Sequence, residues 1–169
     1  AAVNFHDSPL PRYAGMYATS WAILNGEKEH GVSWHLIKDK IDAGDILVQK
    51  QVNIADGDTA ASLNARCFST AITTFKELLA KLKSSRFSLT RQDLTRRSYY
   101  GYYKRPEAVI SIDTGKTAEE IDREVRALTF ADQDNELGIA KLYHNGNFFL
   151  INKLEVVSQD SKYTSGTIL

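Results

Sequence analysis

The 169-residue sequence predicts an α/β protein, with a mixed core in the first half and a smaller, β-rich unit in the second. In the first half, strand-like segments at residues 1–5, 31–37 and 46–54 alternate with helical patterns. In the second half, a single helical pattern is followed by Asn145 and Gly146, a dipeptide typical of tight hairpins. Together these observations predict two structural units joined by a connecting stretch.

The first strand and helix are delimited by turn-forming residues. Residues 1–5 are short, apolar and β-compatible, and they lead into Pro9 and Pro11, which exclude regular structure. A helix is expected at residues 17–24, and the dipeptide at 25–26, Asn-Gly, supplies its stop. The chain therefore begins as strand, loop and helix.

Two further strands enclose a charged loop. Residues 31–37 alternate imperfectly between apolar and polar, which places Ser33 and His35 on one face of the strand. The loop at 38–45 then leads to an apolar strand at 46–54. We therefore expect His35 to share the face that meets a ligand.

A long amphipathic helix follows the turn at residues 56–59. Its apolar positions recur at three- and four-residue spacing: Leu63, Cys67, Ala71, Phe75, Leu78 and Leu82. This one-sided stripe predicts a helix that packs against the sheet.

Residues 83–105 differ in character from the rest of the chain. Only Asp93 offsets their seven Lys and Arg residues, and they contain four tyrosines, at positions 99, 100, 102 and 103. We interpret 89–105 as a basic linker between a core at 1–88 and a unit at 106–169. Such a surface can bind phosphates and stack on bases. Equally, its charges can be solvated while its tyrosines pack an interdomain seam.

The second unit has one helix and one hairpin. Thr117 and Glu120 form a capping box before a helix whose apolar side carries Ile121, Val125 and Leu128. Two strands are expected at 138–143 and 148–157.

Composition excludes several classes of protein. The 21 basic and 21 acidic residues balance, so no net field favours nucleic acid or an anionic surface. The single cysteine, Cys67, cannot form an internal disulfide, and no apolar run approaches the roughly 18 residues that span a bilayer. We expect a cytoplasmic protein with no membrane partner. The chain opens within a strand and without methionine, so we expect the beginning of a longer protein to be missing.

Three polar residues at strand ends and in loops are candidates for chemistry. Asn4 and His6 lie two residues apart, which points both side chains to one face of an extended strand. Asp42 can join them only through tertiary packing. Each also has a structural alternative, because His6 can cap a strand end and Asp42 can serve as a turn residue. The Asp and His spacings match no familiar metal pattern, so no metal is expected.

Four blocks, in order and spacing, resemble the core of formyl-tetrahydrofolate-dependent formyltransferases: Asn4–Gly15, Trp21–Glu27, His30–His35 and Ile41–Leu47. That family includes methionyl-tRNA formyltransferase, glycinamide ribonucleotide transformylase, sugar-amine formyltransferases and the formylation domains of peptide assembly lines. The resemblance implies the carboxy-terminal part of a Rossmann-like formyltransferase domain, followed by a small OB-like β-barrel domain.

The resemblance also implies the roles of the site residues. The family's catalytic trio falls on Asn4, His6 and Asp42. Its folate-binding loop falls on 38–45, and five residues there and nearby are implied to bind the formyl-tetrahydrofolate donor: Ile41, Ala43, Gly44, Asp45 and His35.

The resemblance leaves the amine acceptor open among an aminoacyl-tRNA, a carrier-bound amino acid and an amino sugar nucleotide. The sequence of residues 6–15 most resembles those of assembly-line formylation domains. Family members carry a preceding Rossmann-type half, so we expect this chain alone to be inactive and its first strand to be an exposed edge. Two other functions remain open: a formyl-tetrahydrofolate hydrolase, and a non-catalytic folate-binding or docking module.

Overall fold

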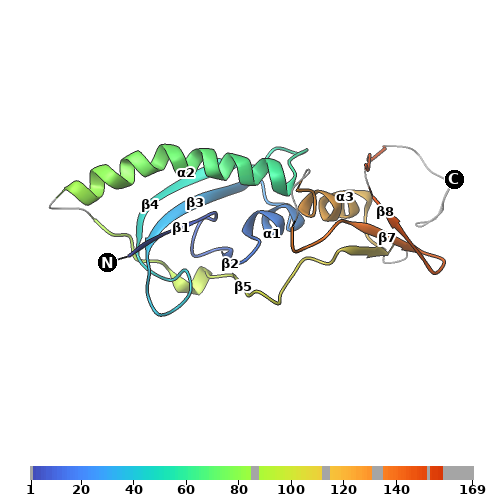
Figure 1. Cartoon of the computed structure of the whole chain (residues 1–169), viewed down its shortest axis with the longest axis horizontal. Coiled ribbons are helices and arrows are strands. Elements are labelled where there is room, and N and C mark those ends of the chain that lie inside the picture. The colour runs from blue at the N-terminus through green and yellow to red at the C-terminus, as the bar shows by residue number, and fades with distance from the viewer. Residues whose placement is uncertain (1, 85–87, 112–114, 131–134, 152, 158–169) are drawn as a thin grey trace.

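The structure, a computed structural model shown in Figure 1, has a three-stranded sheet with a long helix at one end and a smaller sheet with a helix at the other. It describes residues 2–84, 88–111, 115–130, 135–151 and 153–157. The elements, in chain order, are β1 (Val3–His6), β2 (Ala14–Gly15), α1 (Ala18–Leu24), β3 (Glu29–Leu36), β4 (Ile46–Asn53), α2 (Ala60–Lys83), the 3-10 helix η1 (Leu94–Arg96), β5 (Tyr99–Tyr100), β6 (Val109–Ser111), α3 (Ala118–Ala127), β7 (Lys141–His144) and β8 (Asn147–Leu150).

The first sheet is antiparallel, in the order β1-β3-β4. Its register places Asn4 opposite His35 and His6 opposite Ser33. A bulge between Trp34 and His35 shifts the pairing of β3 with β4 next to the charged loop. The three strands expected in the first half are thus confirmed, and β1 is an edge strand of this sheet among the described residues.

Helix α2 runs along one face of this sheet (Figure 1). Thr59 caps its first turn by accepting from the backbone N–H of Ser62. Leu63 and Cys67 are fully buried, as the apolar stripe predicts, but Phe75 and Leu82 are 44% and 43% exposed. The stripe is wrong at these two positions because Thr74 takes the buried place between Ala71 and Leu78, and Leu78 is the last buried residue of the helix.

Residues 88–100 run back along the first half of the chain and are called the strap below. Thr90 pairs with Ile46 through two backbone hydrogen bonds of 2.8 and 2.9 Å, and β5 pairs in parallel with β2. Beyond these bonds, the ring of Tyr100 stacks on Tyr13 and on Trp21, with centroids 5.8 and 4.4 Å apart. The strap is therefore joined to the first sheet's loops by both backbone and aromatic contacts.

The carboxy-terminal unit consists of α3 and the sheet β6-β7-β8. The expected capping box of Thr117 and Glu120 is present, and the hairpin turns at Asn145 and Gly146, both with positive φ as a type I′ turn requires. Residues 112–114, 131–134, 152 and 158–169 of the expected 106–169 domain lie outside the described residues. Within those described, the sheet does not close into a barrel.

The expected strand boundaries in this unit are wrong on both sides of the turn. The first strand begins at Lys141 instead of residue 138, because Gly138 has a φ of +80° and lies in a turn held by Asn135. The second ends at Leu150 instead of residue 157: Leu150 pairs with Lys141, the first residue of β7, and a single backbone bond from the Ile151 N–H to the Ala140 carbonyl, at 3.0 Å, follows this pair.

Helix α3 connects the two units. It packs on α1, and its Ala127 is fully buried in the apolar cluster of the first half. Arg126 donates to the carbonyl oxygen of Asp58 at 2.8 Å, and the N–H of Ala61 donates to the carbonyl of Thr129 at 3.0 Å. The first turn of α2 is thereby fixed from the carboxy-terminal side.

Candidate functional site

The three expected catalytic residues converge at the end of β1. Asn4 and His6 project from that strand toward Asp42, which lies in the loop between β3 and β4. The carboxylate Oδ2 of Asp42 is 3.8 Å from Nε2 of His6, and its Oδ1 is 3.4 Å from Nε2 of His35. The fold thus brings the loop carboxylate to two imidazoles that lie 29 residues apart in the chain.

His6 is held by the loop that follows its strand. Its side chain is buried, and its Nε2 is 2.8 Å from the carbonyl oxygen of Tyr13, so the ring donates Nε2–H to that oxygen. Its Nδ1 lies 3.8 Å from the carboxylate of Asp7. His6 is therefore flanked by two carboxylates, Asp7 and Asp42, while its ring plane is set by a backbone carbonyl.

His35 is the imidazole nearest to Asp42. Its Nδ1 donates to the carbonyl oxygen of Leu36 at 2.9 Å, which turns Nε2 toward the site. Nε2 lies 3.4 Å from the amide nitrogen of Asn4 and 3.4 Å from Asp42. The cross-strand pairing of Asn4 with His35 therefore brings an amide and a carboxylate into contact with the same imidazole.

Asp42 adopts a backbone conformation that is uncommon for a residue with a Cβ, and Asp is one of the types that adopt it most readily. Its φ is +49°, in the left-handed region, and its side chain is 10% exposed. Its Oδ2 accepts from the backbone N–H of Gly15 at 2.9 Å. Burial by itself raises the pKa of Asp42, but the hydrogen bond from His35, the charge of His6 and the Gly15 N–H together outweigh it and hold that pKa below its ordinary value.

The remaining residues of the charged loop set its shape. Gly44 packs so closely on β3 that a Cβ there would lie 1.7 Å from the carbonyl oxygen of Leu36. Asp45 pairs with Lys38 at 2.7 Å. Ala43 is half-buried, whereas Ile41 exposes 56% of its surface at the rim of the site.

Gln92 of the strap also contacts the loop, a contact that no sequence pattern predicts. Its side-chain amide donates to the carbonyl oxygens of Asp42 and Gly44 at 2.9 and 2.7 Å. It is only 7% exposed. The sequence offered one weak signal for Gln92, an uncharged amide between Arg91 and Asp93 in an otherwise charged stretch.

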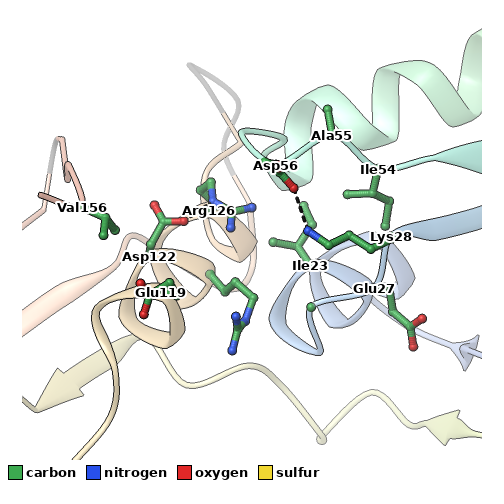
Figure 2. A pocket seen from close by; sticks show the side chains of 12 residues that line it. Ile23, Glu27, Lys28, Ile54, Ala55, Asp56, Glu119, Asp122, Arg126 and Val156 are labelled. Atoms are coloured by element: carbon green, nitrogen blue, oxygen red, sulfur yellow. Dashed lines mark hydrogen bonds and ion pairs between the residues drawn. The ribbon is translucent and has the colours of Figure 1, made fainter. Parts of the chain in front are cut away.

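A separate cavity of about 410 Å³ lies between the two units (Figure 2). It is lined by the end of α1, the turn before α2 and the outer face of α3. Its side chains have both charges, and the Lys28–Asp56 ion pair of 2.6 Å crosses one wall. None of the catalytic candidates lines this cavity, so it is distinct from the site at the end of β1.

Among the described residues, no group of three His, Cys, Asp or Glu side chains is arranged to hold a metal ion. No helix in the described ranges is long and apolar enough to cross a membrane.

Comparison with known proteins shows which proteins the chain resembles. Residues 1–79 match the family model of formyl transferases. The resemblance to formyl-tetrahydrofolate-dependent formyltransferases is therefore confirmed, and the first half of the chain has their Rossmann-like α/β fold.

Particular relatives extend the likeness along the whole chain. Methionyl-tRNA formyltransferase of Coxiella burnetii (strain RSA 331 / Henzerling II) is 34% identical over 167 residues, which is 99% of this chain and 51% of that protein. The N-formyltransferase of Helicobacter canadensis, solved with folinic acid and dTDP-3-aminofucose, superposes with a TM-score of 0.72 at 29% identity, over 85% of this chain and 51% of its own. The sugar 3N-formyltransferase WlaRD, solved with dTDP and 5-N-formyl-tetrahydrofolate, gives 0.72 at 30% identity, over 89% and 54%. The chain thus spans about half the length of these relatives.

Proposed function

We propose that this chain carries the reacting groups of a formyltransferase, which moves a formyl group from formyl-tetrahydrofolate to a primary amine on a larger acceptor. The observation that carries the proposal is the convergence of Asn4, His6 and Asp42, with distances of 3.4 to 3.8 Å linking Asp42 to two imidazoles. Two of the relatives are named as formyltransferases, which supports this reaction for the chain.

The residue types suit this chemistry. The acceptor nitrogen attacks the formyl carbon, a tetrahedral intermediate with an anionic oxygen forms, and the bond from that carbon to the folate nitrogen then breaks. The amide of Asn4 is a neutral donor for the oxygen, and its long 3.4 Å contact with His35 is readily exchanged. Protonated His6 adds positive charge beside it. One preorganised donor of this kind lowers a barrier by about 3–4 kcal/mol.

Asp42 is suited to move protons in this scheme. The acceptor amine must lose a proton as its nitrogen bonds to carbon, and the folate nitrogen must gain one as it leaves. Asp42 is ionised at neutral pH, so its carboxylate can accept the amine's proton directly or through water; its lowered pKa makes it a weaker base than a free carboxylate, so it passes the proton on readily. His6 reaches the oxyanion by exchanging its bond to the Tyr13 carbonyl, which costs about 0.5–1.5 kcal/mol.

We propose that the loop at 38–45 binds the folate. Ile41 offers an exposed apolar surface, Ala43, Gly44 and Asp45 offer backbone groups, and His35 sits behind them. The tight approach of Gly44 to β3 supports a loop shape that is fixed before binding. This pre-formed rim suits a flat heterocycle such as the pterin ring.

We further propose that the chain acts as part of a longer protein, with a core at 1–88, a connecting segment at 89–105 and a unit at 106–169 that contributes to a small OB-like barrel. That the chain covers about half of its relatives, and that β1 is an edge strand, supports a longer protein. The hairpin β7–β8, with its parallel partner β6, supports a contribution of this unit to a barrel. We expect the 169-residue chain alone to show no formyl transfer.

The experiment replaces each reacting group in the full-length protein: Asn4→Ala, His6→Ala and Asp42→Asn. Each is expected to lower kcat by about a hundredfold to a thousandfold, the usual effect of removing one such group. Asp56→Asn is the matched control, because the side chain of Asp56 is 91% exposed and far from the site. Wild-type turnover in all three variants would refute the proposal and favour a docking or folate-binding module.

The acceptor is tested in the same assay. Tetrahydrofolate release is measured with an aminoacyl-tRNA, a carrier-bound amino acid and an amino sugar nucleotide, each supplied separately. Formylated product from one of them identifies the amine. Free formate released at the same rate with no amine present would instead identify a hydrolase.

A further inference from the structure

The loop that carries Asp42 is held from outside the first half of the chain. Asp42 has a left-handed backbone, which is uncommon for a residue with a Cβ although Asp adopts it more readily than most, and neighbouring groups contact it closely. Within the loop itself, the N–H of Ala43 donates to the Lys40 carbonyl at 3.3 Å, a long bond. Lys38 and Asp45 pair at the two ends of the loop, whereas the bond to the carbonyl oxygen of Asp42 comes from the strap.

Gln92 makes the closest of these contacts. Its amide nitrogen donates to the carbonyls of Asp42 and Gly44 at 2.9 and 2.7 Å, and so spans the residue between them. The orientation of the amide follows from these partners, because the reverse orientation would point its oxygen at two carbonyl oxygens. The Gln92 amide is thus a clamp across the turn that presents the Asp42 carboxylate.

The position of Gln92 is itself fixed. Two residues earlier, Thr90 exchanges both backbone hydrogen bonds with Ile46, the first residue of β4. The side chain of Gln92 is 7% exposed, and its Oε1 is buried with no hydrogen-bond donor among the described residues. A buried oxygen left unpaired is unfavourable, so the two bonds made by the amide nitrogen are what favour a glutamine here.

The strap also acts on Asp42 from the side of its carboxylate. The N–H of Gly15 donates to Asp42 Oδ2 at 2.9 Å, and Gly15 is held by β5 through its pairing with Tyr100. Gly15 has a φ of +97°, and a Cβ there would lie 2.1 Å from the carbonyl oxygen of Tyr100. The strap therefore positions Asp42 in two ways: Gln92 holds its backbone carbonyl directly, and β5 holds Gly15, which donates to its carboxylate.

We infer that Gln92 is a positioning residue for formyl transfer, which acts by clamping the Asp42–Gly44 turn so that the Asp42 carboxylate stays between His6 and His35. The inference rests on the proposed function. Because Gln92 does not face the reacting groups, its loss should disturb the rate of the chemical step more than the binding of the acceptor.

The test uses Gln92→Met in the full-length protein, which keeps the length of the side chain and removes both donors. We expect kcat to fall by about tenfold to a hundredfold, since small displacements of a reacting group have effects of this order, while KM for the amine changes less than threefold. Gln49→Met is the matched control, because Gln49 also donates to two acceptors, the Leu10 carbonyl and the Ser33 hydroxyl, but not to the Asp42 loop.

A second readout does not depend on turnover. The Asp42 carboxyl is titrated by carbon NMR in the same variants, and in Gln92→Met its pKa is expected to rise as the carboxylate loses His35 and the Gly15 N–H. If Gln92→Met does not fold, Gln92→Glu, which keeps the shape but replaces the amide donors with a carboxylate, serves in both measurements. An unchanged kcat together with an unchanged Asp42 pKa would overturn the inference.

The two proposals fail in different ways. If Asn4→Ala, His6→Ala and Asp42→Asn all keep full activity, the proposed function is wrong, and the titration still reports whether Gln92 holds the loop. If Asp42→Asn is inactive while the Gln92 variants match the wild type in both measurements, the proposed function stands and the clamp is refuted.

Discussion

Protonation of Asp58 should weaken the contact between the first turn of α2 and the rest of the fold. Its carboxylate accepts from both Arg66 nitrogens at 2.6 and 2.8 Å, from the Ala55 N–H at 2.7 Å and from the Ser62 hydroxyl at 2.8 Å. The paired hydrogen bonds from Arg66, which outweigh the opposing effect of burial, lower the pKa of Asp58 from 3.8 to about 2.

The size of the effect follows from this pKa. Each pKa unit corresponds to about 1.4 kcal/mol, so the ionised carboxylate of Asp58 stabilises the folded state by up to about 2 kcal/mol. Because the folded pKa lies below the unfolded value, this stabilisation is fully present above about pH 4 and is lost as pH falls toward 2. Asp58→Asn should therefore cost about 2 kcal/mol at pH 7 and progressively less below pH 4.

Chemical denaturation of the wild type and the variant at a series of pH values from 7 to 2.5 checks this. Asp56→Asn serves as the control, because Asp56 is exposed and its single ion pair with Lys28 is worth little in water. A loss for Asp58→Asn that stays constant down to pH 2.5, or that equals the loss for Asp56→Asn at pH 7, would show that the Arg66 contact does not stabilise the fold.

Three further predictions follow from the packing around the site. Gly44→Ala places a methyl group 1.7 Å from the Leu36 carbonyl, so the loop must move, and binding of folate measured by calorimetry should weaken at least tenfold, whereas Gly57→Ala, with open space around it, should bind normally. Leu63→Ala removes a fully buried side chain between α2 and the sheet and should lower the free energy of unfolding by about 2–5 kcal/mol, measured by denaturation. Burial raises the pKa of the Cys67 thiol to about 12, so Cys67 should not react with a thiol reagent at pH 8 until the protein unfolds; rapid labelling of the folded protein would contradict its burial.

Elements whose pattern is local could be predicted from the sequence. The helix after Thr59 and the turn at Asn145 and Gly146 are set by neighbouring residues, and both lie where expected. Ser33 and His35, which the alternation placed on one face, lie opposite His6 and Asn4 in the pairing of β1 with β3. Strand ends were harder to predict. The end of β8 at Leu150 depends on where its partner β7 begins, and the sequence of β8 alone contains no information about that boundary.

The candidate site shows the same division. Asn4 and His6 could be placed together by strand spacing alone, and the resemblance brought Asp42 to them. That His35 would lie nearer than His6 to Asp42 depends on cross-strand register and on the bulge beside Trp34, neither of which a single strand's pattern contains. Gln92 could not be predicted because it reaches the loop across a separation of 50 residues.

The parallel pairing of β5 with β2 bears on how such proteins can be cut and recombined. A boundary drawn at residue 88, where composition changes, would separate Tyr100 from the rings of Tyr13 and Trp21 and Gln92 from its carbonyl partners. A chimaeric protein that keeps the site intact must therefore place its junction after Tyr100. The segment that has to be transferred is longer than the first sheet and α2 alone.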